Sequence, residues 1–160
     1  MSIYVLIELL LLLVIIYFVS KNRSSSYNVI NPIQGDRLNE NQTLNTGDQK
    51  TSQDGKYRYR LEADGKLALY NSAGTEIWSL KPESKPGSTG RYLKLETNGN
   101  LVMYDQTPRG DLAAWSTNTG GQGKSNSRFF VIQNDGNLIL WAKNSQSRDI
   151  KLWKTDTVGK

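Results

Sequence analysis

The chain has 160 residues, enough for one domain, and carries a formal net charge of +5 with no cysteine and no histidine. This composition excludes disulfide bonds, thiolate and imidazole catalysis and the usual zinc sites, so no metal and no cofactor are expected. The lysines and arginines are scattered along the chain, so nucleic acid is not expected as a partner either.

The first predicted element is a membrane anchor at residues 1–20. The run from Ile3 to Val19 is almost wholly aliphatic and aromatic, and it is broken only by Glu8. A helix of this length spans about 26 Å, which is near the short limit for crossing a bilayer. No lysine or arginine precedes the run, and the run is long for a signal-peptide core. A retained anchor is therefore favoured, and a cleaved signal peptide is the alternative.

The residues after the apolar run predict its orientation. Lys21 and Arg23 follow directly, and by the positive-inside rule they predict a single-pass protein whose C-terminal domain faces the cytosol. Residues 21–34 are polar and show no clear period, so they are predicted to form a linker. The remaining residues, 35–160, are predicted to form one domain.

One short phrase occurs three times in the predicted domain. It starts at Glu62, at Glu96 and at Gln133, so the starts lie 34 and 37 residues apart. A fixed period of this size indicates one supersecondary unit used repeatedly. Each copy has Asp-Gly or Asn-Gly in its middle, and these pairs favour tight hairpin turns. The alternation that follows indicates a strand with a leucine face in the core and a shallow, mixed surface face.

A tryptophan-bearing segment follows each copy and predicts a further strand. The three segments are 75–79, 113–117 and 151–155. Their tryptophans could stack on a ligand, but they are predicted to fill the axis where three sheets meet, because large aromatic side chains dominate cores. These residues are Trp78, Trp115 and Trp153. No helical period appears after residue 20, so the predicted fold class of the domain is all-β.

The repeated phrase resembles the signature of the bulb-type mannose-binding lectins of monocot plants. That signature reads Gln-x-Asp-x-Asn-x-Val-x-Tyr and is followed by a Trp-Ser/Ala-x-Asn-Thr strand. The stretch from Trp115 to Gly121 is especially close to it, and the resemblance covers about residues 35–160. It implies a type II β-prism of three four-stranded sheets with pseudo-threefold symmetry. The predicted N-terminal transmembrane helix precedes this domain.

The resemblance also implies where a sugar would bind. In that family the polar motif residues hydrogen-bond mannose hydroxyls, and the valine packs on the sugar. The third copy then implies a carbohydrate site made of Gln133, Asp135, Asn137, Ile139 and Trp141. The second copy, altered at two of its five positions, implies a weaker site made of Glu96, Asn98, Asn100, Val102 and Tyr104. The first copy keeps only Asp64 and Tyr70 of the motif and is expected to bind no sugar.

An alternative reading of the phrase is purely structural, because hairpins need the Asp/Asn-Gly turn and the core needs the leucines. An enzyme is not expected, since the motif carboxylates lie on an open hairpin face with no partner for acid–base chemistry.

Two functions therefore remain open. The first is a structural tether whose anchor holds a membrane and whose β-prism binds a protein partner. A minor capsid protein of a large virus with an internal membrane is one such setting. The degraded motif, the predicted cytosolic orientation and the absence of cysteine motivate it. The second is a membrane-anchored mannose-binding lectin, whose weak single site would depend on avidity.

Overall fold

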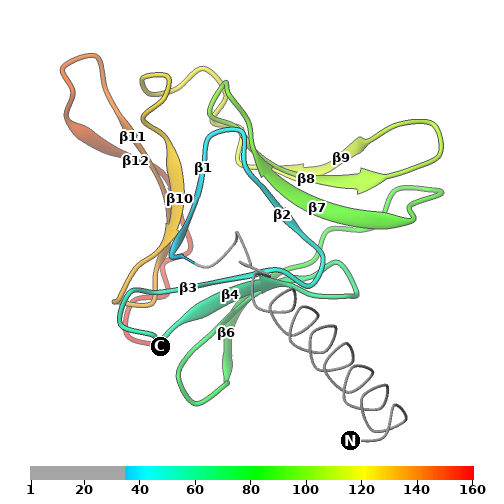
Figure 1. Ribbon diagram of the computed structural model, residues 1–160, viewed down its shortest axis with the longest axis horizontal. Helices are drawn as coiled ribbons and strands as arrows, with labels where there is room; N and C mark the ends of the chain where they lie inside the picture. Colours follow the sequence, from blue (N-terminus) through cyan, green and yellow to red (C-terminus); the bar gives the residue numbers. More distant parts are fainter. Residues whose placement is uncertain (1–34) are drawn as a thin grey trace, which may run out of the picture. The chain divides into compact units, whose positions relative to one another are not determined.

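The computed structural model describes residues 35–160, which form three four-stranded antiparallel sheets (Figure 1). This confirms the all-β prediction and the arrangement of a lectin β-prism. The predicted anchor at 1–20 and linker at 21–34 lie outside the described residues, and the predicted domain boundaries stay a prediction. From residue 35 to the C-terminus, the chain has no helix long and apolar enough to cross a bilayer.

The three sheets are named after the copy of the phrase that each contains. Sheet I has the strand order β3 (Gln49–Thr51), β4 (Arg58–Leu61), β5 (Leu67–Tyr70), β6 (Glu76–Leu80). Sheet II has the order β2 (Thr43–Asn45), β7 (Gly90–Leu95), β8 (Leu101–Gln106), β9 (Leu112–Ser116). Sheet III has the order β1 (Arg37–Asn39), β10 (Phe129–Ile132), β11 (Leu138–Lys143), β12 (Asp149–Lys154). Figure 1 shows β1, β2 and β3 following one another around the centre, each at the edge of a different sheet.

The repeated phrase forms the hairpin turn at the middle of each sheet, as predicted. The turn glycines Gly65, Gly99 and Gly136 have φ angles of 79°, 89° and 84°, a region that glycine adopts at little cost. A β-carbon at any of the three would also meet a side chain of the neighbouring sheet. It would lie 3.2 Å from Arg91 Cδ, 2.5 Å from Arg128 Cδ and 2.6 Å from Tyr57 Cε1, respectively. Each turn is therefore covered by a residue next to the first residue of an inner strand in another sheet.

The leucine face of each third strand is buried in the common core, as predicted. Leu101, Met103, Leu138 and Leu140 are fully buried there. The opposite face differs from the predicted shallow surface, because the aliphatic residue of each phrase is buried as well. Ile139, for example, is 1% exposed because Val131 and Lys154 flank it on the neighbouring strands.

The core departs from threefold symmetry at one cross-strand pair. Two of the equivalent pairs are apolar: Leu38 opposite Phe130 in sheet III and Leu44 opposite Leu93 in sheet II. In sheet I, Lys50 lies opposite Tyr59. Both are buried, and the Tyr59 hydroxyl has no hydrogen-bond partner within residues 35–160. Burial lowers the pKa of Lys50, because an apolar environment disfavours the ammonium.

The three tryptophans lie on the fourth strand of each sheet and meet one another. Trp153 lies between Trp78 and Trp115, with ring centroids 6.0 Å and 5.8 Å away in edge-to-face geometry. All three are partly buried and pack against the core. The fully buried aromatic residues are instead Tyr59 and Phe130, which contact each other edge to face at 5.3 Å.

Candidate functional site

At the Asp/Asn position of the phrase, one side-chain oxygen forms a hydrogen bond within its own turn in all three copies. Its side-chain oxygen accepts a hydrogen bond from the backbone N–H two residues later. The distances are 3.1 Å at Asp64, 2.8 Å at Asn98 and 3.0 Å at Asp135. This is the Asx-turn geometry that stabilises tight turns. A turn function alone thus accounts for Asp or Asn at this position.

The asparagine of the phrase is present in the second and third copies, and its side-chain oxygen also accepts hydrogen bonds from within the domain. Asn137 is 4% exposed, and its Oδ1 accepts hydrogen bonds from the Thr155 hydroxyl at 2.8 Å and the Thr157 N–H at 3.3 Å. Asn100 Oδ1 likewise accepts from Thr117 and from the Thr119 N–H, both at 3.2 Å. These bonds join the hairpin to the segment after the tryptophan strand.

The outer faces of sheets I and II are closed by a side-chain network. The tyrosine hydroxyl of the phrase donates to the glutamate at the first position: Tyr70 to Glu62 at 2.9 Å and Tyr104 to Glu96 at 3.0 Å. Burial, and then the hydrogen bond to Glu96, raise the pKa of Tyr104. A basic side chain completes each network, with Arg60 3.7 Å from Glu62 and Lys94 3.9 Å from Glu96.

Aromatic contacts cover the same two faces further. Tyr92 stacks on Tyr104 in sheet II with a centroid distance of 5.3 Å, and the Arg58 guanidinium lies 4.9 Å from the ring centroid of Tyr70 in sheet I. In the predicted second site, Glu96 and Tyr104 bind each other, Asn98 and Asn100 hold the hairpin, and Val102 is buried.

The outer face of sheet III is open. At the register position of Arg60 and Lys94 it carries Val131, opposite Ile139. Gln133 takes the place of the glutamates, and Trp141 takes the place of the tyrosines. No acid–base–tyrosine network is formed from these residues, and a hollow of about 360 Å³ lies over the sheet. Its volume falls within the range of small-ligand sites.

The hollow combines aromatic, aliphatic and amide groups. Phe129 and Trp141 contribute rings, Val131 contributes aliphatic surface, and the amides come from the residues Gln53, Gln133 and Asn134. Ile132 also lies at the wall of the hollow, but its side chain is fully buried in the core. Asp36, Arg37 and Asp149 complete its lining. Each ring also has a cation beside it: Arg37 lies 4.8 Å from the Phe129 centroid and Lys151 5.3 Å from the Trp141 centroid.

The structure divides the predicted third-copy residues into two groups. Gln133 and Trp141 line the hollow, whereas Asp135, Asn137 and Ile139 do not. The lining residues that the motif did not predict include Arg37, Phe129 and Val131. The position of the turn could have indicated Phe129 and Val131, because a hairpin around Gly136 places Phe129 opposite Trp141 and Val131 opposite Ile139. Nothing in the phrase indicates Arg37, which comes from β1.

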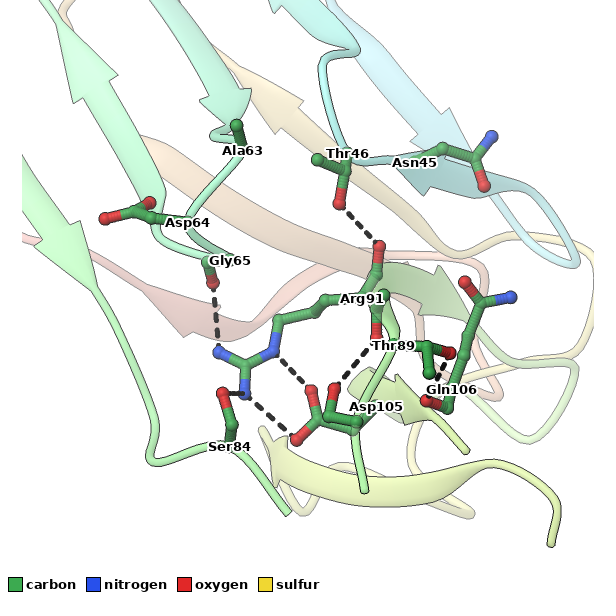
Figure 2. A pocket seen from close by; sticks show the side chains of 12 residues that line it. Asn45, Thr46, Ala63, Asp64, Gly65, Ser84, Thr89, Arg91, Asp105 and Gln106 are labelled. Atoms are coloured by element: carbon green, nitrogen blue, oxygen red, sulfur yellow. Dashed lines mark hydrogen bonds and ion pairs between the residues drawn. The ribbon is translucent and has the colours of Figure 1, made fainter. Parts of the chain in front are cut away.

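A second hollow, of about 450 Å³, lies between sheets I and II, and Figure 2 shows the residues around it. It contains a buried ion pair in which Arg91 Nε donates to Asp105 Oδ1 at 2.6 Å. The guanidinium also donates to the carbonyls of Gly65 and Pro82, and Asp105 accepts from the Lys85 N–H at 2.6 Å. The hydrogen bond from Arg91 lowers the pKa of Asp105. These charged groups are satisfied within the protein, so they hold the two sheets together.

Solved structures similar to this fold are lectins. The Japanese Marasmius oreades lectin is 29% identical with a TM-score of 0.62, and the match covers 78% of this chain and 95% of that one. A monomeric monocot mannose-binding lectin from Gastrodia elata is 27% identical with a TM-score of 0.59, covering 78% and 97%. The mannose-specific agglutinin from snowdrop (Galanthus nivalis) bulbs, solved with methyl-α-D-mannoside, is 27% identical with a TM-score of 0.53, covering 78% and 99%.

The comparisons support the lectin resemblance of the repeated phrase and the lectin β-prism class of the fold. Lectins are non-enzymatic carbohydrate-binding proteins. No protein-family model matches the chain, and no curated protein matches it.

Proposed function

We propose that residues 35–160 form a non-enzymatic, bulb-lectin-like domain that binds a carbohydrate in the hollow over sheet III. One observation carries the proposal: of the three equivalent faces, the face of sheet III leaves its polar and aromatic groups available to a ligand. The corresponding groups of sheets I and II bind one another. The side chain of Gln133, by contrast, makes no hydrogen bond within residues 35–160.

The chemistry of the hollow suits a pyranose. A sugar ring presents hydroxyls at its edge and aliphatic C–H groups on its faces. The amides of Gln53, Gln133 and Asn134 can donate to and accept from hydroxyls, and the rings of Phe129 and Trp141 offer apolar surface. Because the site is open and shallow, single-site affinity would be weak, and many copies on one surface would supply avidity.

A mannose-type glycan is a proposed ligand class, because two of the similar solved structures are named as mannose-binding or mannose-specific. The binding mode would differ from the one expected from the motif. Asp135 Oδ1 and Asn137 Oδ1 hold the hairpin and its neighbours, and Gln133 and Trp141, which line the hollow, would supply the motif's contacts to the sugar.

The test compares the full chain with a variant whose hollow is filled. The protein would be purified in a detergent without a sugar headgroup, and its retention would be measured on surfaces coated with mannan or with an N-acetylhexosamine polymer. Val131→Lys places on sheet III the residue that sheet II has at Lys94, so it should fill the hollow and reduce retention about tenfold or more. Lys94→Arg, a change at the same register position on the closed face of sheet II, should leave retention unchanged. Equal retention of Val131→Lys and the wild-type chain would contradict the proposal.

A structural tether is a second candidate, favoured by the closed faces of sheets I and II. On two of the three equivalent faces the motif tyrosine binds the motif glutamate instead of a sugar. In this proposal these two faces bind a protein. The apolar run from Ile3 to Val19 anchors a membrane, and the domain faces the cytosol and binds a protein such as a viral capsid shell. Protease protection in membrane vesicles tests the orientation. Protection of residues 35–160 inside vesicles derived from the endoplasmic reticulum would contradict the tether.

A further inference from the structure

Three amide side chains line the hollow of sheet III, and two of them are held in place. Gln53, from the loop between β3 and β4 of sheet I, donates from Nε2 to Asp36 Oδ2 at 2.9 Å. Asn134, in the turn between β10 and β11, accepts the Asp54 N–H on Oδ1 at 3.1 Å. These bonds leave the Gln53 Oε1 as a fixed acceptor and the Asn134 Nδ2 as a fixed donor within the described residues. Gln133, also in this turn, can act in either sense.

The hollow also presents aliphatic surface, which does not suit the hydroxyl groups of a plain sugar. Val131, which is 4% exposed, lies two residues after Phe129 on β10 and therefore next to the cross-strand ring pair of Phe129 and Trp141. A hydroxyl placed against aliphatic surface loses its hydrogen bonds to water and gains none, which is unfavourable. A methyl group placed there is favourable, because it removes apolar surface from water on both sides. The ligand that fits this hollow therefore carries a methyl group close to an amide donor and acceptor.

The two acidic residues that line the hollow are each paired with a cation. Arg37 donates to both oxygens of Asp36, at 2.8 Å and 3.0 Å, and Lys143 pairs with Asp149 at 2.8 Å. Neither acid is left to attract a cationic ligand, and Lys151 beside the Trp141 ring adds a further positive charge. This disfavours an amino sugar with a free ammonium.

We infer that the hollow of sheet III binds an N-acetylated amino sugar in preference to a plain hexose. The acetamido carbonyl accepts a hydrogen bond from Asn134, its N–H donates to Gln53, and its methyl group lies against Val131 and Phe129. Gln133 and the Trp141 ring contact the pyranose itself. The inference rests on the proposed carbohydrate-binding function and adds to it the group that the site distinguishes.

The test measures competition by free sugars that differ at one position. Full-length protein in sugar-free detergent would be bound to the glycan-coated surface that retains it best, and released with N-acetylglucosamine, glucose or mannose. N-acetylglucosamine and glucose differ only in the acetamido group. N-acetylglucosamine should release the protein at a concentration about tenfold lower than glucose or mannose, since two hydrogen bonds and one buried methyl group are added.

A conservative variant tests the residues. Asn134→Asp keeps the oxygen that accepts the Asp54 N–H and removes the amide donor, so the variant should stay folded. It should reduce the preference for N-acetylglucosamine over glucose to about threefold or less, without weakening competition by glucose. Thr97→Ala, at the equivalent turn position of sheet II, is the matched control and should keep the tenfold preference.

The outcomes separate the two proposals. Competition by glucose or mannose at least equal to that by N-acetylglucosamine would overturn the inference, while sugar binding itself would stand. An unchanged preference in Asn134→Asp would also overturn the inference. Absence of retention on any glycan surface would overturn the proposed function together with the inference.

Discussion

The hollow between sheets I and II and the hollow over sheet III have similar volumes, but their polar groups differ in whether they bind one another. Between sheets I and II, Arg91 and Asp105 are buried, and their hydrogen-bonding capacity is taken up within the protein. Over sheet III, Gln133 makes no side-chain hydrogen bond within residues 35–160, and Trp141 and Phe129 border open space. Polar groups that are hydrogen-bonded within the protein contribute to stability and offer little to a ligand, whereas polar groups without such partners can bind a ligand. Changes in the first should therefore alter stability, and changes in the second should alter binding.

The largest expected effect is on stability at the hollow between sheets I and II. Asp105→Ala leaves the Arg91 guanidinium buried without its carboxylate, and this should lower the free energy of unfolding by about 3–5 kcal/mol. Denaturant unfolding of the full chain in detergent measures the loss. Lys143→Ala, which removes an exposed ion pair, should cost at most about 1 kcal/mol. At a temperature where Asp105→Ala is folded, it should bind glycan like the wild type. A change in affinity would break the proposed division between the hollows.

The same pair predicts a response to acid. The hydrogen bond from Arg91 lowers the pKa of Asp105 in the folded state below its value of about 3.9 in the unfolded chain. The resulting stabilisation is present above the unfolded pKa and is lost as pH falls through the folded pKa. Asp105→Asn should therefore lose less stability than the wild type between pH 5 and the acid-unfolding region, measured by unfolding at each pH. Parallel curves would contradict this role.

A buried lysine that forms no ion pair within residues 35–160 should behave in the opposite way. Lys50 stands where the other two sheets have leucine, so Lys50→Leu should raise the free energy of unfolding by about 1–3 kcal/mol at neutral pH. Burial lowers the pKa of Lys50, so the penalty is complete below the folded pKa and disappears as pH rises past the unfolded value of about 10.4. The gain should shrink at alkaline pH, and a gain independent of pH would contradict the explanation. Gln49→Leu, the exposed neighbour on β3, is the control.

At the hollow over sheet III, the aromatic wall should affect binding more than stability. Trp141→Ala removes the ring that borders the open space and should weaken glycan binding about tenfold, measured by retention on the coated surface. Tyr104→Ala removes the equivalent ring from sheet II, where the face is closed, and should leave binding unchanged. Equal losses in the two variants would show that both faces bind sugar and would break the comparison.

The smallest expected effect comes from a single amide. Gln133→Ala removes one adaptable hydrogen-bonding group and should weaken binding by about 0.5–1.5 kcal/mol, roughly threefold to tenfold. Stability should stay within about 0.5 kcal/mol of the wild type, because the side chain has no partner to lose in the described part of the chain. Glu96→Ala at the equivalent position of sheet II should instead cost stability, since it breaks the bond to Tyr104, and should not change binding.

Much of the fold was readable from the sequence because its signals are local. The Asp/Asn-Gly pairs specify the turns at Gly65, Gly99 and Gly136, and the alternation around Leu101 and Leu138 specifies which face is buried. The short strands β1, β2 and β3 carry no such signal. With three residues each, they take their structure from their partners, which is why the Lys50–Tyr59 pair could not be predicted.

The candidate site was less predictable, because a motif gives residue types and does not reveal which atoms their side chains contact. Asp135 and Asn137 match a sugar-binding signature, yet their oxygens bind the backbone and neighbouring threonines. Val131 lies outside the phrase, and it matters only because the register places it where Arg60 and Lys94 close the other faces. A sequence motif records which residues occur, whereas the openness of a face depends on what lies opposite them.

The coverage of each turn glycine by another sheet has a consequence for how the domain assembles. Arg91 of the second repeat covers Gly65 of the first, Arg128 of the third covers Gly99 of the second, and Tyr57 of the first covers Gly136 of the third. The contacts form a closed cycle, so the last repeat completes the first. A fragment of two repeats would leave one turn uncovered and one covering side chain without its site. The three repeats should therefore fold in a single cooperative transition rather than one after another, unlike the open-ended stacks of solenoid proteins.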